Sequence, residues 1–143
     1  MSNKHFSVTY ADWEQNKTVL RAVRESVFII EQNVPKDLEW DDRDKGSLHV
    51  VATDVNGKTI GTGRLTDTGQ IGRMAVLNEW RNCGVGSALL EKLIELADQH
   101  KIHPLYLNAQ KKAIPFYQRH GFECTGDEFI EAGIPHQRME QQH

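Results

Sequence analysis

The chain has 143 residues, enough for one domain with a hydrophobic core and too few for two, so we expect a single domain over residues 1–143. Its formal net charge of −3 gives no support for a general nucleic-acid binder or anionic-membrane binder, which would need a basic field. The sequence has no apolar run long enough to span a bilayer, no signal-peptide pattern, and only two cysteines, too few for a disulfide framework. We therefore expect a cytoplasmic protein without nucleic-acid or membrane partners.

The N-terminal part predicts a strand and then a helix. Apolar residues alternate with polar ones from Phe6 to Tyr10, as along a strand, and Asp12-Trp13-Glu14-Gln15 has the form of a capped helix start. We expect the helix to end near Pro35. Its predicted core face consists of Leu20, Val23, Val27 and Ile30.

Acidic side chains crowd the segment that follows this helix. They are Asp37, Glu39, Asp41, Asp42 and Asp44. Such a run is typical of a solvated connecting loop rather than of buried structure. The functional alternative is that the loop attracts a cationic amine toward a nearby site.

Three strands are predicted to follow as a meander. Leu48 to Thr53 is rich in β-branched residues, and Thr59 to Thr66 returns as its hairpin partner after the Asn56-Gly57 turn. A second turn, Thr68-Gly69, leads into the third strand, Gln70 to Val76. This strand ends beside a loop that contains two glycines.

The rest of the chain is organised around the join between this third strand and a long amphipathic helix. From Val85 onward, apolar residues recur every three or four positions, and charged residues occupy the opposite side. The loop has Gly84 and Gly86 instead of a capping Ser, Thr, Asp or Asn, so the first backbone N–H groups should be free. Free N–H groups at the positive end of a helix bind anions, and glycine lets a phosphate approach closely. The pattern predicts a phosphate-bearing ligand at residues 81–87.

Two other phosphate-binding motifs do not fit. A dinucleotide fingerprint needs a third glycine where this chain has Leu89. The Gly57-Lys58-Thr59 triplet resembles the end of a P-loop, but the first glycine of that motif is replaced by Ala52. A flavin or nucleotide binder that uses the same helix start is therefore a poor interpretation.

After the long helix, the sequence predicts a strand, a short helix and a closing pair of strands. Leu105 to Ala109 should lie parallel to the strand before the long helix, because a strand, helix, strand crossover stays within one sheet. A helix from about Lys112 to His120 should end at Gly121. The closing segment, Phe122 to Glu140, is expected to hold two strands.

Two motifs, in this order, resemble signatures of the GNAT superfamily of N-acyltransferases. Arg81-x-x-Gly84-x-Gly86 is similar to its acetyl-CoA pyrophosphate loop. Ala113-Ile114-Pro115-Phe116-Tyr117, followed by Gly121-Phe122, is similar to its Ala-x-x-Phe-Tyr-x-x-x-Gly-Phe signature. The resemblance covers nearly the whole chain. It implies a single-domain α/β (α+β) fold, with a mixed, mostly antiparallel central sheet flanked by helices and splayed beside the glycine loop to admit acetyl-CoA.

The resemblance also implies which residues contact acetyl-CoA. Backbone groups of the strand before the loop would pair with the pantetheine arm and polarise the thioester carbonyl, and the loop would hold the pyrophosphate. Asn108, at the end of the fifth strand, would touch the pantetheine or the acetyl group, although an Asn that merely ends a strand is nearly as good an explanation. The full set is Met74, Ala75, Val76, Arg81, Asn82, Cys83, Gly84, Val85, Gly86, Ser87, Asn108 and Phe116.

Tyr117 matches the general acid of the superfamily, which protonates the departing coenzyme A thiolate. A phenol with a pKa of about 10 would give its proton to a thiolate whose conjugate acid has a pKa of about 8.5, and we expect this transfer to be downhill. The structural alternative is a core aromatic on a short helix.

The general base is less clearly marked. An alkyl ammonium with a pKa of about 10.4 is neutral in only about one molecule in a few thousand at pH 7, so a base or a water chain must take its proton. Many family members have a Glu on the strand before the glycine loop, whereas this chain has Ile71-Gly72-Arg73-Met74-Ala75-Val76. The candidates are Glu31 and His136, on segments that border the acceptor side in the family. A helix-end carboxylate and a strand surface residue are the structural alternatives.

Taken with the resemblance, these features predict transfer of an acetyl group from acetyl-CoA to a primary amine of a small molecule or peptide by direct attack. No metal is expected, because His100-x-x-His103 has no third ligand. The alternative is a non-catalytic acyl-CoA-binding or regulatory module. A homodimer is compatible with the resemblance, and the acceptor amine and the acyl chain length stay open.

Overall fold

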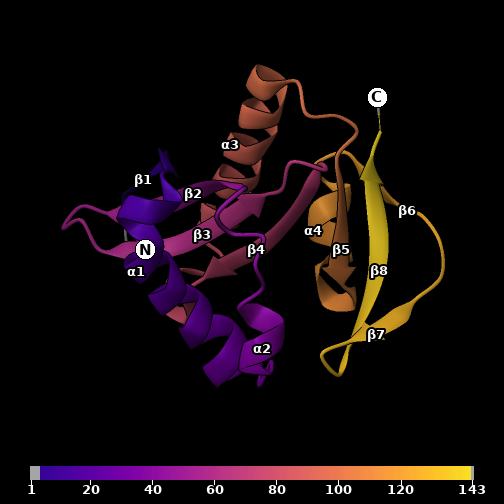
Figure 1. Cartoon of the computed structure of the whole chain (residues 1–143), viewed down its shortest axis with the longest axis horizontal. Helices are drawn as coiled ribbons and strands as arrows, with labels where there is room; N and C mark the ends of the chain where they lie inside the picture. Colours follow the sequence, from indigo (N-terminus) through magenta and orange to yellow (C-terminus); the bar gives the residue numbers. More distant parts are fainter. Residues whose placement is uncertain (1–3, 143) are drawn as a thin grey trace.

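The computed structural model describes residues 4–142, which form one mixed sheet with helices packed on both faces (Figure 1). The strands are β1 (Phe6–Ala11), β2 (Leu48–Asp54), β3 (Thr59–Leu65), β4 (Gln70–Val76), β5 (Tyr106–Gln110), β6 (Phe122–Cys124), β7 (Phe129–Glu131) and β8 (Ile134–Gln141). Their order is β1-β2-β3-β4-β5-β8-β6, and β7 also pairs with β8. The pair β4 and β5 is parallel and the other pairs are antiparallel, as predicted.

The first helical region begins where predicted and then changes its winding. The helices are α1 (Trp13–Arg24), the π-helix η1 (Glu25–Glu31), α2 (Lys36–Glu39), the 3₁₀ turn η2 (Asn78–Trp80), α3 (Val85–His100), the 3₁₀ turn η3 (Lys111–Ala113) and α4 (Ile114–Gln118). The Asp12 carboxylate caps α1 by accepting a hydrogen bond from the Gln15 N–H at 3.1 Å.

The prediction that Ile30 lies in the core is wrong, since it is 70% exposed. The wider i→i+5 winding of η1 changes the angular spacing of side chains and turns Ile30 away from the buried Val27.

Helices α1 and α3 cover opposite faces of the β1 to β4 part of the sheet. Side chains alternate between the two faces along each strand. On β2, Val50 and Ala52 belong to the core beneath α3. Val51, which lies between them, packs with Leu20 of α1 on the other face.

Two glycines on β3 allow α3 to approach the sheet closely. A Cβ on Gly63 would lie 2.9 Å from Leu93 Cδ1 and 3.0 Å from Met74 Sδ, and one on Gly61 would lie 3.0 Å from Leu89 Cδ1. At such distances the side chains of Leu93, Met74 and Leu89 would have to shift to admit a Cβ. The close packing fixes the start of α3 directly above the end of β4.

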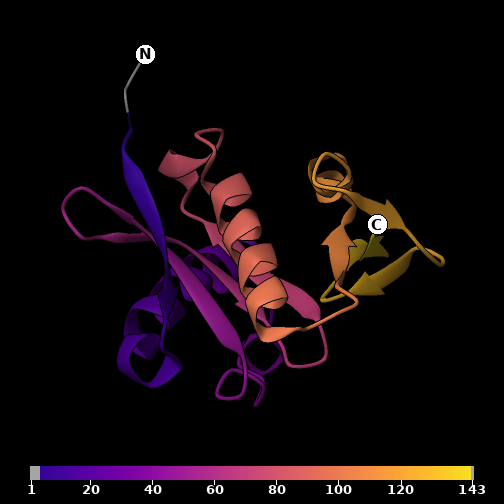
Figure 2. The ribbon, with the colours of Figure 1, turned by 90° about the horizontal axis from the view of Figure 1, so that it is seen from above.

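The sheet divides between β4 and β5. These strands pair at Gln70 with Tyr106 and at Ile71 with Leu107, and then diverge. Figure 1 shows the two strands separating from their upper ends, and Figure 2 shows the two halves of the molecule side by side. We call this divergence the seam.

A β-bulge on β4 lies where the seam opens. The register with β3 shifts between the pairs Thr62 with Ala75 and Arg64 with Gly72, so one extra residue is accommodated on β4. Arg73 takes this place with a φ of 50°, in the left-handed region that non-glycine residues rarely adopt. The bulge alters the course of β4 before it reaches the glycine loop.

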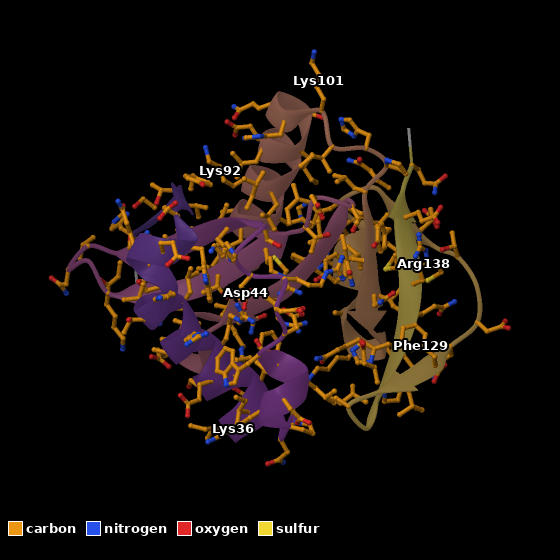
Figure 3. All side chains as sticks on the ribbon, in the orientation of Figure 1. Lys36, Asp44, Lys92, Lys101, Phe129 and Arg138 are labelled. Atoms are coloured by element: carbon orange, nitrogen blue, oxygen red, sulfur yellow. The ribbon has the colours of Figure 1, made fainter. Side chains whose placement is uncertain are left out.

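The acidic segment after the first helix is not a solvated connector, contrary to the prediction. Glu39 and Asp44 are only 3% and 4% exposed, and Asp44 lies near the middle of the view in Figure 3. Arg24 Nε lies 2.6 Å from Glu39 Oε2, and Arg24 Nη1 lies 2.8 Å from Asp44 Oδ1. The buried ion cluster, as we name this group, consists of Arg24, Glu39, Asp41, Asp44, Arg64 and Arg73. Three arginines thus neutralise three acids that look solvated in the sequence.

The C-terminal part departs from the prediction in two details. The closing segment forms three strands, β6, β7 and β8, rather than two, because β6 and β7 pair with different ends of β8. The predicted helix from Lys112 to His120 is shorter, since η3 precedes α4 and α4 ends at Gln118. Gly121 follows with a φ of 88°, as expected of a glycine stop. Within residues 4–142, no helix is both long and apolar enough to cross a membrane.

Candidate active site

The start of α3 has the open form that its sequence predicted. Gly84 takes the position before the first turn with a φ of 85°, and no side chain of the described residues caps the helix there. The first N–H groups of α3 therefore face a depression formed by the glycine loop, which we call the loop depression. It is lined by Val76, Trp80, Arg81, Asn82, Gly84, Val85, Gly86, Ser87, Phe116 and Arg119. Such a helix start is suited to hold an anion.

Gly86 leaves room above the helix start. Its backbone is not in the left-handed region, and a Cβ there would meet the Phe116 ring at 3.5 Å, an ordinary contact. Packing within the chain therefore gives no reason for a glycine, whereas a ligand pressed against the backbone would. Ser87 is tied to the second half of the molecule through its hydroxyl, 3.0 Å from His120 Nε2. Cys83 is exposed, and its thiol donates to the Arg81 carbonyl.

Arg81 and Glu31, which were predicted to have separate roles, form an ion pair. Arg81 Nη1 lies 2.6 Å from Glu31 Oε2, and Nη2 lies 2.7 Å from Oε1, the bidentate geometry of a strong pair. Arg81 Nε also donates to the Val76 carbonyl at 3.0 Å. The hydrogen bonds and charge of Arg81 hold the pKa of Glu31 below its ordinary value. A carboxylate held in this way is a poor base, so these contacts argue against Glu31 as the proton acceptor.

A cavity of about 290 Å³ occupies the seam, and we call it the seam cavity. One wall comes from η1, α2 and the bulge of β4, and the other from β5, α4, β7 and β8. Met74, Tyr117 and His136 all line it. Met74 and Tyr117 are close in sequence to Val76 and Phe116 of the loop depression, so the two concavities share β4 and α4 as walls.

The three residues at the end of β4 differ in their surroundings. Met74 lines the seam cavity and Val76 lines the loop depression. Ala75 is buried and packs against Val23 and Val27 of the first helical region. The backbone of this segment therefore runs between the two concavities, where β5 no longer pairs with it.

Tyr117 lines the seam cavity with its ring packed edge-on against Phe116 and Phe122, at centroid distances of 5.0 and 6.2 Å. Burial raises the pKa of its phenol to about 12. The expectation of a downhill proton transfer is wrong, because a phenol of this pKa holds its proton more tightly than a thiol with a pKa of about 8.5. Transfer to a solvated thiolate is uphill by about 3.5 pKa units, or roughly 5 kcal/mol. Tyr117 can serve as the acid only if burial also raises the basicity of the thiolate.

His136 lies on β8 and is only 8% exposed. Its Nδ1 is 2.7 Å from the Ile134 carbonyl, which can only accept a hydrogen bond, so Nδ1 carries a proton. In the neutral ring, Nε2 then has the free lone pair, and it lies 3.8 Å from the Glu131 carboxylate. The imidazole ring stacks on Phe129, which is labelled in Figure 3, with the two ring centroids 5.8 Å apart. This stacking fixes the plane of the imidazole. These contacts orient His136 as a proton acceptor toward the seam cavity that it lines.

Two polar groups of β5 face the same cavity. Asn108 lies in the middle of β5 rather than at its end, and its side chain lines the seam cavity. The Gln110 amide donates to Gln32 Oε1 at 2.9 Å and so connects β5 to the end of the first helical region across the seam. Sequence reasoning missed this contact, because the two residues lie far apart in the chain.

Two arginines of the site were also missed. Arg119, two residues after Tyr117, lines the loop depression and is exposed there. No spacing in the sequence relates Arg119 to the glycine loop, because the two lie far apart in the chain. Arg73 lines the seam cavity from the bulge of β4, and no sequence pattern marked it. Among residues 4–142, no group of three or more His, Cys, Asp and Glu side chains could hold a metal ion.

Comparison with known proteins shows to which family the chain belongs. A family model described as an acetyltransferase (GNAT) domain matches residues 13–142. The chain belongs to the GNAT acetyltransferase family. It is 40% identical over 121 residues to the Bacillus subtilis protein named "Uncharacterized N-acetyltransferase YjcF", a match that covers 82% of this chain and 86% of YjcF.

Solved GNAT structures share the whole architecture. The crystal structures of Escherichia coli ElaA and of an acyl-CoA N-acyltransferase from Pseudomonas aeruginosa each match with a TM-score of 0.85. They are 27% and 28% identical to this chain, and each match covers 95% of this chain and 99% of the other. The fold and the family predicted from two motifs are therefore confirmed. GNAT proteins use acetyl-CoA. The roles of individual residues stay predictions.

Proposed function

We propose that this GNAT protein transfers an acetyl group from acetyl-CoA to a primary amine by direct attack. The observation that carries the proposal is the shared wall of the two concavities. The pyrophosphate would lie at the open start of α3, in the loop depression. The pantetheine arm would then run along the unpaired end of β4, and its thioester would reach the seam cavity beside Met74 and Tyr117.

The backbone would supply the electrostatic part of the mechanism. Because β5 leaves β4 after Ile71, the backbone from Met74 to Val76 has no strand partner on that side among residues 4–142 and can pair with the pantetheine amides. A backbone N–H of this segment would donate to the thioester carbonyl as it becomes an oxyanion. The buried ion cluster and the close packing of α3 hold β4 rigid, so these groups are positioned before the substrate binds.

His136 would remove the proton that keeps the acceptor amine from attacking. An ammonium entering the seam cavity meets the Glu131 carboxylate and the free Nε2 of His136. Nε2 takes one proton, the amine nitrogen forms a bond to the thioester carbon, and the carbon–sulfur bond breaks. Tyr117 donates its proton to the sulfur, which leaves as a thiolate within the buried cavity and is therefore more basic than a solvated one. The phenolate of Tyr117 then takes the second proton from the nitrogen of the new amide, and His136 releases its proton to solvent. We prefer His136 to Glu31 because Glu31 is held by Arg81 and does not line the seam cavity.

The first experiment is thermal unfolding of the purified protein with acetyl-CoA and coenzyme A, and with NAD and ATP as controls. A ligand present at a hundred times its Kd stabilises the fold by about 2.7 kcal/mol, which is readily detected. A shift specific to acetyl-CoA and coenzyme A, followed by thiol release with one member of an amine panel, is the expected result. A shift without thiol release from any amine would favour a non-catalytic acyl-CoA-binding module. No shift with either ligand would refute the proposal.

A further inference from the structure

Charged side chains line both walls of the seam cavity. Arg73 lies on the β4 wall beside its partner Glu39, and Glu131 and His136 lie on the β7 and β8 wall. The lining is about equally polar and apolar, and its apolar residues include Phe28, Val34, Leu38, Ile71 and Leu107. A cavity of about 290 Å³ holds only a small molecule. A short chain with a charged group at each end suits such a mixed lining.

Hydrogen bonds hold the Arg73 guanidinium in place and leave part of it able to donate to a ligand. Its Nη2 donates to the carbonyls of Leu38 and Glu39 at 3.1 and 3.3 Å and to Asp41 Oδ2 at 3.0 Å. Its Nε is buried without a hydrogen-bond partner among the described residues, although it lies 3.3 Å from the Glu39 carboxylate. These contacts with the described residues use Nη2 and Nε, and so leave Nη1 for a ligand. A guanidinium fixed in this way recognises a carboxylate by planar, charge-assisted hydrogen bonds.

The charges around the cavity argue against an acceptor with a second ammonium group. Glu39, the acid that lines the cavity on the α2 side, is engaged by Arg24 and Arg73. The lining on that side therefore offers a second cation a carboxylate that is already paired, whereas it presents the donors of Arg73. Glu131, by contrast, is exposed and lies beside the one histidine of the cavity.

We propose that the acceptor is a small amino-carboxylic acid, with its ammonium group at Glu131 and His136 and its carboxylate at Arg73. The inference rests on the proposed function, since it names the substrate class of that site. Arg73 acts here as a specificity-determining residue, and its unusual backbone on the β4 bulge places the guanidinium in the cavity wall. The apolar lining packs against the methylene groups between the two ends of the acceptor.

The test uses matched acceptors that differ only at the carboxylate. Glycine, β-alanine, 4-aminobutyrate and 5-aminovalerate are each compared with the alkylamine in which a methyl group replaces the carboxylate, and with the corresponding amino amide. Thiol release is measured at saturating acetyl-CoA. We expect one chain length to give a kcat/KM at least about tenfold above that of its alkylamine and its amide, the usual effect of a charge-assisted hydrogen bond. In Arg73→Gln this preference should fall by about 10- to 100-fold.

A matched control separates recognition from structure. Asp44→Asn disturbs the same buried ion cluster through Arg24 and Arg64, but Asp44 makes no ion pair with Arg73 among the described residues and does not line the seam cavity, so this variant should keep the wild-type preference. Because the readout is a ratio of two acceptors on one enzyme, a partial loss of folded protein cancels. Acetylation of alkylamines and amides as efficient as that of every amino acid would overturn the inference alone, as would an unchanged ratio in Arg73→Gln. No thermal shift with acetyl-CoA and no thiol release with any acceptor would overturn the proposed function and this inference together.

Discussion

His136→Asn removes the proposed base and keeps the hydrogen bond that positions it. The Asn amide nitrogen takes approximately the place of Nδ1, so it can still donate to the Ile134 carbonyl, 2.7 Å from Nδ1 in the structure. Only Nε2 and its lone pair are lost. A general base contributes about 10²- to 10⁴-fold, so kcat/KM should fall by that factor, which corresponds to about 3–5.5 kcal/mol of transition-state stabilisation.

The pH dependence adds a second signature. Without a base, the variant depends on amine that is already neutral, so its rate should rise about tenfold per pH unit up to the amine pKa of about 10.4. The assay is thiol release over a range of pH, with the Kd of acetyl-CoA measured in parallel and expected to stay unchanged. Glu31→Gln is the matched comparison and should retain most of kcat. The reasoning is refuted if His136→Asn keeps the wild-type rate at pH 7, or if Glu31→Gln alone loses about 10²-fold in kcat.

Three further predictions follow from the same geometry. Tyr117→Phe should lower kcat by about 10²-fold with little change in acetyl-CoA affinity, and full turnover in the thiol-release assay would remove Tyr117 from the mechanism. Gly63→Ala should lower the free energy of unfolding in urea by about 1–3 kcal/mol, because its Cβ would lie 2.9 Å from Leu93, whereas Gly72→Ala meets nothing within 4 Å and should change it by less than about 1 kcal/mol. Equal stabilities of the two would contradict the close packing of α3. Burial raises the pKa of Asp41, but the hydrogen bonds and charge of Arg64 outweigh it, so the pKa lies below its ordinary value. The stability that Asp41 contributes is therefore present above pH 4 or so and is lost as the pH falls through the lowered pKa. The advantage of the wild type over Asp41→Asn in urea should shrink between pH 7 and pH 3, and an advantage that does not vary with pH would contradict this.

Features that depend on neighbouring residues were predictable from the sequence. The open start of α3 follows from Gly84, since the residue before the first turn has no side chain to cap the helix. The parallel pairing of β4 and β5 follows from the crossover rule, and Gly121 ends the segment after α4. Each of these inferences needs only local geometry and chain direction, which the order of residues contains.

Features that depend on distant partners were not predictable. The acids after the first helix look solvated until Arg24, Arg64 and Arg73 are brought beside them from three different elements. Likewise, Arg81 and Glu31 lie fifty positions apart, so no spacing rule relates them. The bulge at Arg73 depends on how β4 registers with β3, which periodicity alone does not fix. The candidate residues of the site could be named from the motifs, but their contacts could not.

The narrow join at the seam has a consequence for how the protein unfolds. Beyond the two residue pairs that join β4 to β5, the side-chain hydrogen bond from Gln110 to Gln32 crosses the seam. Because this bond joins side chains, the backbones of the two halves are weakly coupled there. A ligand lying in the seam adds contacts to both halves and makes their opening more cooperative. Amide hydrogen exchange in β5 and β8 should therefore slow more on acetyl-CoA binding than exchange in β2, which is paired on both sides. Part of the free energy of acetyl-CoA binding would then be used to hold the two halves of the protein together more rigidly.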